Sequence, residues 1–110
     1  MNQPTKKIYN MEIEGKIIDV LPERSGISQT TQEPWRVASY LLEIPGYRPT
    51  KMMFEVSDGQ AGRIARLGIT KGRKYRIFFE IEAQQYNGRW YNTVRAWDAR
   101  LTDEPLEETT

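Results

Sequence analysis

The stretch GRKYRIFFEIEAQQYNGRWYNTVRAWDARL, residues 72–101, decides the fold of this chain. It is predicted to form two long strands that fold back on each other at Asn87-Gly88. Asn-Gly suits a two-residue type I′ turn, because both central residues need a positive φ, which Asn tolerates and Gly adopts freely. The stretch therefore predicts a long β-hairpin, around which the other elements have to be arranged.

The register of this hairpin follows by counting outward from Tyr86 opposite Arg89. One face is then a predicted buried stripe, made of Ile77, Phe79, Ile81, Val94 and Ala96. The other face carries the predicted cross-strand pairs Phe78–Trp97, Glu80–Arg95 and Gln84–Tyr91. Because this second face mixes aromatic rings with charges, it is where we expect function.

The composition indicates a single small domain, since 110 residues can bury a modest hydrophobic core. The chain has no cysteine, which excludes disulfides and thiolate metal sites. No apolar run approaches the roughly 20 residues of a membrane helix, and the N-terminus lacks the apolar region of a signal peptide. We therefore expect a cytoplasmic protein.

The net charge of +1 is unevenly distributed. The last eight residues, DEPLEETT, contain four acids and no base, whereas residues 1–102 contain 16 basic and 11 acidic residues. Residues 71–100 hold seven of the twelve aromatic residues and seven Lys or Arg against three acids. A basic, aromatic body with an acidic tail is typical of nucleic-acid binding, although a solvated tail on an ordinary domain has the same composition.

The first half of the chain predicts three further strands. Residues 11–21 alternate as a strand whose apolar phase slips at Ile17-Ile18, which indicates a bulge in a strongly bent strand. Residues 22–34 are predicted to be a long loop, which raises the question of whether it becomes ordered on binding a partner. Strands are predicted at 35–44, with Ala38, Tyr40, Leu42 and Ile44 inward, and at 50–57, with Met52, Phe54 and Val56 inward.

A short helix is predicted after the third strand, beginning with a capping box at Ser57–Gln60 and ending at Gly68. The element order is that of the OB-fold, a five-stranded barrel with one helix between strands three and four. An SH3-like barrel is the competing architecture, but it has no helix at this place. The predicted organisation is an arm at 1–10, an all-β OB-fold domain at 11–101 and an acidic tail at 102–110.

Two segments, MEIEGKIIDVLPERSG (11–26) and YNGRWYNTVRAW (86–97), resemble a family of uncharacterised bacterial OB-fold proteins that is classed as a domain of unknown function. That family is similar to bacterial single-stranded-DNA-binding proteins. The resemblance covers roughly residues 11–101, and it implies an OB barrel and nucleic-acid binding. Bacterial single-stranded-DNA-binding proteins usually end in an acidic tip with a terminal Phe that binds partner enzymes, whereas the acidic tail of this chain ends without an aromatic residue.

The candidate binding residues are aromatic and basic side chains at the hairpin tip and on the strands beside it. Single-stranded nucleic acids bind where Lys and Arg contact phosphates and aromatic rings stack on bases. The predicted stacking residues are Tyr86, Trp90 and Tyr91, and the predicted phosphate contacts are Arg89, Arg95, Arg76 and Lys51. Trp90 lies on the inward phase, so it could instead cap the core. Phe78 and Trp97 are more consistent with a structural pair on the sheet.

Catalysis finds little support, because the chain has neither His nor Cys. The sequence predicts no enzyme, no metal site and no cofactor. Our first hypothesis is a module that binds single-stranded DNA with little sequence preference, with RNA left open, and homo-oligomers would raise its affinity. The alternative is a protein-interaction or assembly module whose outward aromatics form the interface.

Overall fold

A computed structural model describes residues 11–59 and 62–102 of the chain. The elements within these residues are β1 (Met11–Val20), β2 (Arg24–Ile27), β3 (Pro34–Ile44), β4 (Thr50–Ser57), α1 (Arg63–Leu67), β5 (Lys74–Tyr86) and β6 (Arg89–Leu101). The predicted arm at 1–10 and all but the first residue of the predicted tail at 102–110 lie outside the described residues. In the part that is described, no helix is long and apolar enough to cross a membrane.

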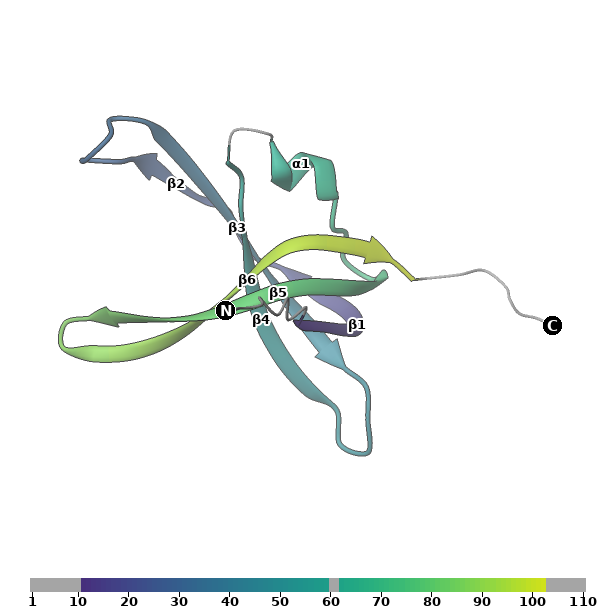
Figure 1. The fold of residues 1–110 in the computed structure, drawn as a ribbon. Helices are drawn as coiled ribbons and strands as arrows, with labels where there is room; N and C mark the ends of the chain where they lie inside the picture. The colour runs from purple at the N-terminus through teal and green to yellow at the C-terminus, as the bar shows by residue number, and fades with distance from the viewer. Residues whose placement is uncertain (1–10, 60–61, 103–110) are drawn as a thin grey trace, which may run out of the picture.

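Five of the strands form a ring in the order β1-β5-β6-β4-β3, and β1 closes it by pairing with β3 as well. Neighbours in the ring are antiparallel except β4 and β6, which are parallel and meet at one residue pair, Glu55 and Arg95. Helix α1 lies between the third and fourth strands of the ring, β4 and β5. This confirms the predicted all-β OB-fold. Figure 1 shows the hairpin ends of β2–β3, β3–β4 and β5–β6 pointing away from the ring in three directions.

Strand β1 serves both halves of the ring. It pairs with β5 through Met11–Lys16 and with β3 through Lys16–Val20, and its register with β3 shifts between Ile17 and Asp19. The bulge predicted at Ile17-Ile18 is thus confirmed. Gly15 is buried where β1 passes from one partner to the other, and a Cβ atom there would lie 2.5 Å from the Glu43 carbonyl oxygen. The crossing therefore requires a residue without a side chain.

The core lies inside the ring and uses the inward sets predicted for β3 and β4. Tyr40, Leu42 and Phe54 are buried, and the rings of Tyr40 and Phe54 stack with centroids 5.3 Å apart. Burial of the Tyr40 hydroxyl raises its pKa, because the charged phenolate is poorly solvated there. The remaining buried members of this core are Ile17, Ala38, Val56, Ile64, Ile69, Tyr75, Ile77 and Ala96.

The β5–β6 hairpin has the predicted turn. Asn87 and Gly88 both have positive φ, at 51° and 77°, and Tyr86 pairs with Arg89. The predicted register holds from there to Phe79 and then shifts, so that Phe78 lies opposite Asp98 instead of Trp97. Trp97 is the extra residue of this bulge.

The structure confirms one predicted contact in the hairpin and contradicts one predicted burial. Only the register of Phe78 differs from the prediction, because Phe78 and Trp97 still form the predicted aromatic pair (5.5 Å between centroids), and Phe78 is buried beneath Trp97 and the Arg100 guanidinium (5.0 Å from the ring centroid). Ile81 was expected in the buried stripe but is 50% exposed. The reason is that, within the described residues, β1 pairs with β5 only as far as Phe79, so this pairing does not extend to Ile81.

The predicted loop at residues 22–34 is also wrong in part. It contains β2, which pairs with residues 34–37 of β3, so that only residues 28–33 form a turn. The Ser28 hydroxyl organises this turn by accepting hydrogen bonds from the backbone N–H groups of Thr30 and Thr31. The β2–β3 hairpin thus extends the sheet beyond the ring, as Figure 1 shows.

The predicted capping box at Ser57–Gln60 is wrong. Ser57 is the last residue of β4, and α1 begins at Arg63, after the left-handed Gly62, which provides no side-chain cap. The cap comes from Asp58 instead, whose Oδ1 accepts a hydrogen bond of 2.9 Å from the Ile64 N–H. Gln60 lies outside the described residues. The predicted stop is confirmed, since the left-handed Gly68 donates its N–H to the Ile64 carbonyl.

We predict that Gly15→Ala destabilises the protein by about 1–3 kcal/mol, because the new methyl group overlaps backbone that cannot move without breaking the β1–β3 pairing. Gly46→Ala is the matched control, since a Cβ atom there meets nothing within 4 Å. The free energy of unfolding in urea measures both effects. Equal stability of the two variants would contradict the importance of the β1 crossing.

Candidate nucleic-acid interface

The outer part of the β5–β6 hairpin extends beyond the ring and has no other strand beside it. We call residues 80–94 the distal ribbon. In the described chain, β1 pairs with β5 only up to Phe79, and β4 meets β6 only at Arg95. A two-stranded ribbon in water is marginally stable by itself, because it has no core of its own. Large side chains on it are therefore available to a ligand.

Three aromatic residues of the distal ribbon are strongly exposed. The exposed fractions are 69% for Tyr86, 67% for Trp90 and 48% for Tyr91. Within the described residues, none of the three rings contacts another aromatic ring. All three predicted stacking residues are thus brought together near the hairpin tip with accessible ring surface.

The register divides these rings between the two faces of the ribbon. Tyr91 lies opposite Gln84, and Tyr86 lies opposite Arg89, which places both tyrosines on the face that is outward in the ring. Trp90 lies opposite Gln85, on the face that continues the core and carries Ile81. A ligand that contacts all three rings therefore has to pass around the ribbon near its tip.

The side chains predicted to contact phosphate differ in whether they already form an ion pair with a carboxylate. Arg95 forms an ion pair with Glu82, rather than the predicted pair with its direct neighbour Glu80. Within residues 11–59 and 62–102, Arg89 and Lys51 form no ion pair. Arg89 is thus the unpaired cation of the ribbon tip.

Arg76 lies far from this group. It is ten residues from Tyr86 on the same strand, which corresponds to roughly 33 Å at the rise of an extended chain. Its Nε donates a hydrogen bond of 2.8 Å to Glu14 Oε2, and Glu12 lies 3.5 Å away. The hydrogen bond to Glu14 is the main reason that the pKa of Arg76 is raised. The structure does not bring Arg76 to the ribbon tip.

Lys51 shares the outward face with Arg95 and Tyr91. Glu55 of β4 and Arg95 of β6 form the parallel bridge, and Lys51 and Tyr91 each lie four residues before that bridge on their strands. Side chains two or four residues apart on a strand lie on the same face. Lys51 is exposed. It could therefore extend the tip site along the outer surface of β4.

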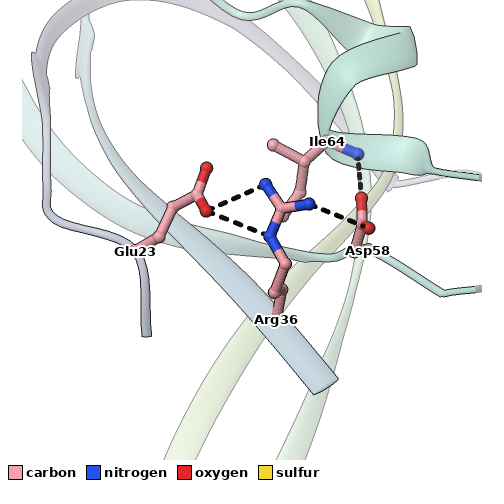
Figure 2. A network of polar contacts seen from close by, with 4 residues as sticks. All are labelled: Glu23, Arg36, Asp58 and Ile64. Atoms are coloured by element: carbon pink, nitrogen blue, oxygen red, sulfur yellow. Dashed lines mark hydrogen bonds and ion pairs between the residues drawn. The ribbon is translucent and has the colours of Figure 1, made fainter. Parts of the chain in front are cut away.

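A second polar centre, not predicted from the sequence, joins the base of the β2–β3 hairpin to α1. Figure 2 shows the Arg36 guanidinium between two carboxylates: Nη2 lies 2.9 Å from Glu23 Oε1, and Nη1 lies 3.4 Å from Asp58 Oδ2. The other Asp58 oxygen caps α1 at Ile64. The hydrogen bond with Glu23 is the main reason that the pKa of Arg36 is raised. The network ties three elements together at one end of the ring.

The acidic side chains of the described residues are dispersed or paired with arginines. No group of three acidic side chains there could hold a metal ion. The carboxylates that lie close to other charges face arginines, as with Glu23, Glu14 and Glu82. The arrangement suits binding by stacking and by charge.

We predict that Asp58→Ala lowers the free energy of unfolding by about 1 kcal/mol, because α1 loses its cap. Asp58→Asn keeps an oxygen that can accept from Ile64 and removes only the charge next to Arg36. Exposed ion pairs contribute little, so the Asn variant is expected to lose less than half as much. Urea unfolding distinguishes the variants, and an Asn variant as unstable as the Ala variant would contradict the capping role.

Comparison with known proteins identifies one family and several solved structures that this chain resembles. Residues 12–100 match the family described as Domain of unknown function (DUF3127). No curated protein matches the chain. Among solved structures, the dimeric N-terminal domain of PriB protein from Thermoanaerobacter tencongensis is 19% identical, with 86% of this chain and 97% of that chain covered and a TM-score of 0.56.

Two further structures are more distant. A small single-stranded DNA-binding protein from Streptomyces coelicolor is 10% identical, with 84% and 93% of the two chains covered and a TM-score of 0.47. One from Mycoplasma pneumoniae is 14% identical, with 94% and 100% covered and a TM-score of 0.44. At these identities, the similarity of the PriB domain shows a shared fold.

Proposed function

Because the chain belongs to the family described as a domain of unknown function (DUF3127), its function has to be argued from its own residues, and we propose that it binds single-stranded DNA through the distal ribbon. The proposed activity is non-enzymatic and has little sequence preference. Stacking on aromatic rings tolerates any base, since every base has a π face.

The observation that carries this proposal is the exposure of Tyr86, Trp90 and Tyr91 on a ribbon that the ring leaves uncovered. Each stacked base is worth about 1–3 kcal/mol. The fold supports the same location for the binding site. OB-folds bind oligonucleotides on the face of their second and third strands and on the loops after strands one and four. In this chain those are β3, β4, the β2–β3 hairpin and the ribbon tip.

The proposed roles follow the two faces of the ribbon. Tyr86 and Tyr91 stack bases on the outward face, where Arg89 contacts phosphate. Trp90 stacks a base from the opposite face as the strand passes around the tip. Lys51 and Arg95 lie along the continuing outward surface, and Arg95 can exchange Glu82 for a phosphate. Arg76 is left out of the proposed site, because it lies ten residues from Tyr86 along β5 and is paired with Glu14.

One observation favours a second candidate, a protein partner. Ile81 lies on the same face of the ribbon as Trp90, and the two residues are 50% and 67% exposed. An exposed apolar surface of this kind is typical of protein interfaces. A protein partner would bind this face and would show little dependence on salt, whereas nucleic-acid binding weakens steeply with salt.

We predict that Trp90→Ala and Arg89→Ala both weaken binding of a labelled oligo-dT of about 30 nucleotides, in different ways. Loss of the ring lowers affinity about 5- to 100-fold and leaves the salt dependence unchanged. Loss of one phosphate contact reduces the slope of log K against log salt by about 1. Fluorescence anisotropy at several salt concentrations measures both quantities.

Matched variants make this test specific. Trp90→Phe keeps an aromatic ring and is expected to retain most of the affinity. Arg66→Ala removes one exposed cation from α1, away from the ribbon, and is expected to leave the salt slope unchanged. If the folded wild-type protein does not bind oligo-dT even at low salt, the proposed function is wrong.

A further inference from the structure

We propose that Trp35 is a second base-stacking platform, and that a bound single strand runs from the distal ribbon across the outer surface of β4 to the base of the β2–β3 hairpin. This inference rests on the proposed function, and it adds a residue and a path to it. It starts from a feature of β2 that the sequence did not reveal.

The Trp35 ring lies against a glycine on the neighbouring strand. Trp35 and Gly26 are directly opposite in the β2–β3 pairing, and a Cβ atom at Gly26 would lie 2.8 Å from Trp35 Cζ2. The indole therefore covers the backbone of β2 at this point, which also stabilises the hairpin. The side chain is still 42% exposed. A ring with one side supported by backbone and the rest open to solvent is a suitable surface for stacking.

A hollow of about 530 Å³ adjoins Trp35, between residues 33–37 on one side and 57–59 on the other. Two of the side chains that line it are the carboxylates of Glu33 and Asp58, and its one lining cation, Arg36, is already paired with Glu23 and Asp58. This charge distribution disfavours a phosphate. Of the parts of a nucleotide, a neutral base is therefore better accommodated there than a phosphate.

The hollow is also held in shape before any ligand arrives. Arg36 bridges Glu23, at the start of the β2–β3 hairpin, and Asp58, which caps α1 (Figure 2). The Asp58 N–H in addition donates to the Arg36 carbonyl oxygen over 3.0 Å. Because this backbone hydrogen bond connects residue 36 to residue 58, a base between the two walls would bind with a smaller cost of ordering.

Trp35 and Tyr91 lie on one continuous face of the sheet. Along β3, Trp35 shares the outward phase with Ser39, which pairs with Glu55, and Glu55 meets Arg95 of β6. Four residues along each outer strand and two strand spacings give a separation on the order of 30 Å between Trp35 and Tyr91. A single strand of several nucleotides spans that distance, within the roughly 4–16 nucleotides that one OB-fold binds.

The surface between the two aromatic ends is close to neutral. Glu55 pairs with Arg24 over 3.1 Å, and Arg95 pairs with Glu82. These pairs reduce the repulsion that Glu55 and Glu82 would exert on a phosphate backbone, whereas the exposed Glu80 beside Arg95 has no ion pair within the described residues. They also add little attraction, so the two aromatic ends are expected to provide most of the contacts that hold the strand.

Tryptophan fluorescence tests this proposal directly, because the chain has only three tryptophans. The variant Trp90→Phe/Trp97→Phe leaves Trp35 as the sole emitter and keeps aromatic rings at the other two positions. We expect oligo-dT of about 30 nucleotides to quench the Trp35 emission with the same saturation curve as the anisotropy of the labelled oligonucleotide. The control, Trp35→Phe/Trp90→Phe, leaves Trp97 over Phe78 and is expected to show no quenching.

The outcomes separate this inference from the proposed function. Anisotropy that reports binding while Trp35 emission stays constant would overturn the second platform and leave the ribbon site intact. No binding by the wild-type protein would overturn both. Affinity gives an independent result: Trp35→Leu still covers Gly26 but cannot stack, and we expect binding about 5- to 100-fold weaker, with Trp35→Phe close to wild type. Equal affinity of the Leu variant and wild type would contradict the proposal.

Discussion

The passage of β1 from one half of the sheet to the other is the constraint on which this structure depends. One strand of ten residues pairs with β5 at its beginning and with β3 at its end, and only this double pairing closes the ring. The change of pairing partner from β5 to β3 occurs next to Gly15, where the Glu43 carbonyl oxygen occupies the space of a side chain. The fully buried Ile17 is followed by the bulge at Ile17–Asp19, where the register of β1 with β3 shifts.

The closed ring determines which parts of the longer strands stay uncovered. β5 and β6 have 13 residues each, but β1 reaches β5 only to Phe79 and β4 reaches β6 only at Arg95. Within the described residues, the rest of the hairpin extends beyond these pairings. Tyr86, Trp90 and Tyr91 contribute less to stability there than core rings do, since the exposed part of each ring gains none of the roughly 25 cal/mol per Å² that burial provides. Their presence is better explained by a ligand that covers them.

Features that depend on local sequence were predicted well. The Asn87-Gly88 turn, the hairpin register as far as Phe79 and the slip at Ile17-Ile18 are properties of neighbouring residues, and the structure confirms them. The OB-fold follows from these features and the order of the elements. β2 was missed because Arg24–Ile27 is short and does not alternate between apolar and polar residues.

Features that depend on contacts between residues far apart in the sequence could not be predicted from local patterns. The exposure of Ile81 reflects where β1 ends, and the burial of Phe78 requires a bulge at Trp97 and a guanidinium from Arg100. For the candidate site, the sequence identified the ribbon aromatics and the inward phase of Trp90. It could not show that Arg76 and Arg95 are paired with Glu14 and Glu82, or that Trp35 lies on Gly26.

The central claim is that one face of the β3–β4–β6 surface, together with the ribbon tip, binds single-stranded DNA. The most direct test is a titration of ¹⁵N-labelled protein with oligo-dT, followed by two-dimensional amide NMR spectra. The account predicts shifts that cluster at residues 84–93, at 51–55 and at 34–37, with none at 71–76, which include Arg76, or at its carboxylate partners Glu12 and Glu14. Shifts that cluster at 71–76 and spare the ribbon, or an unchanged spectrum, would contradict it.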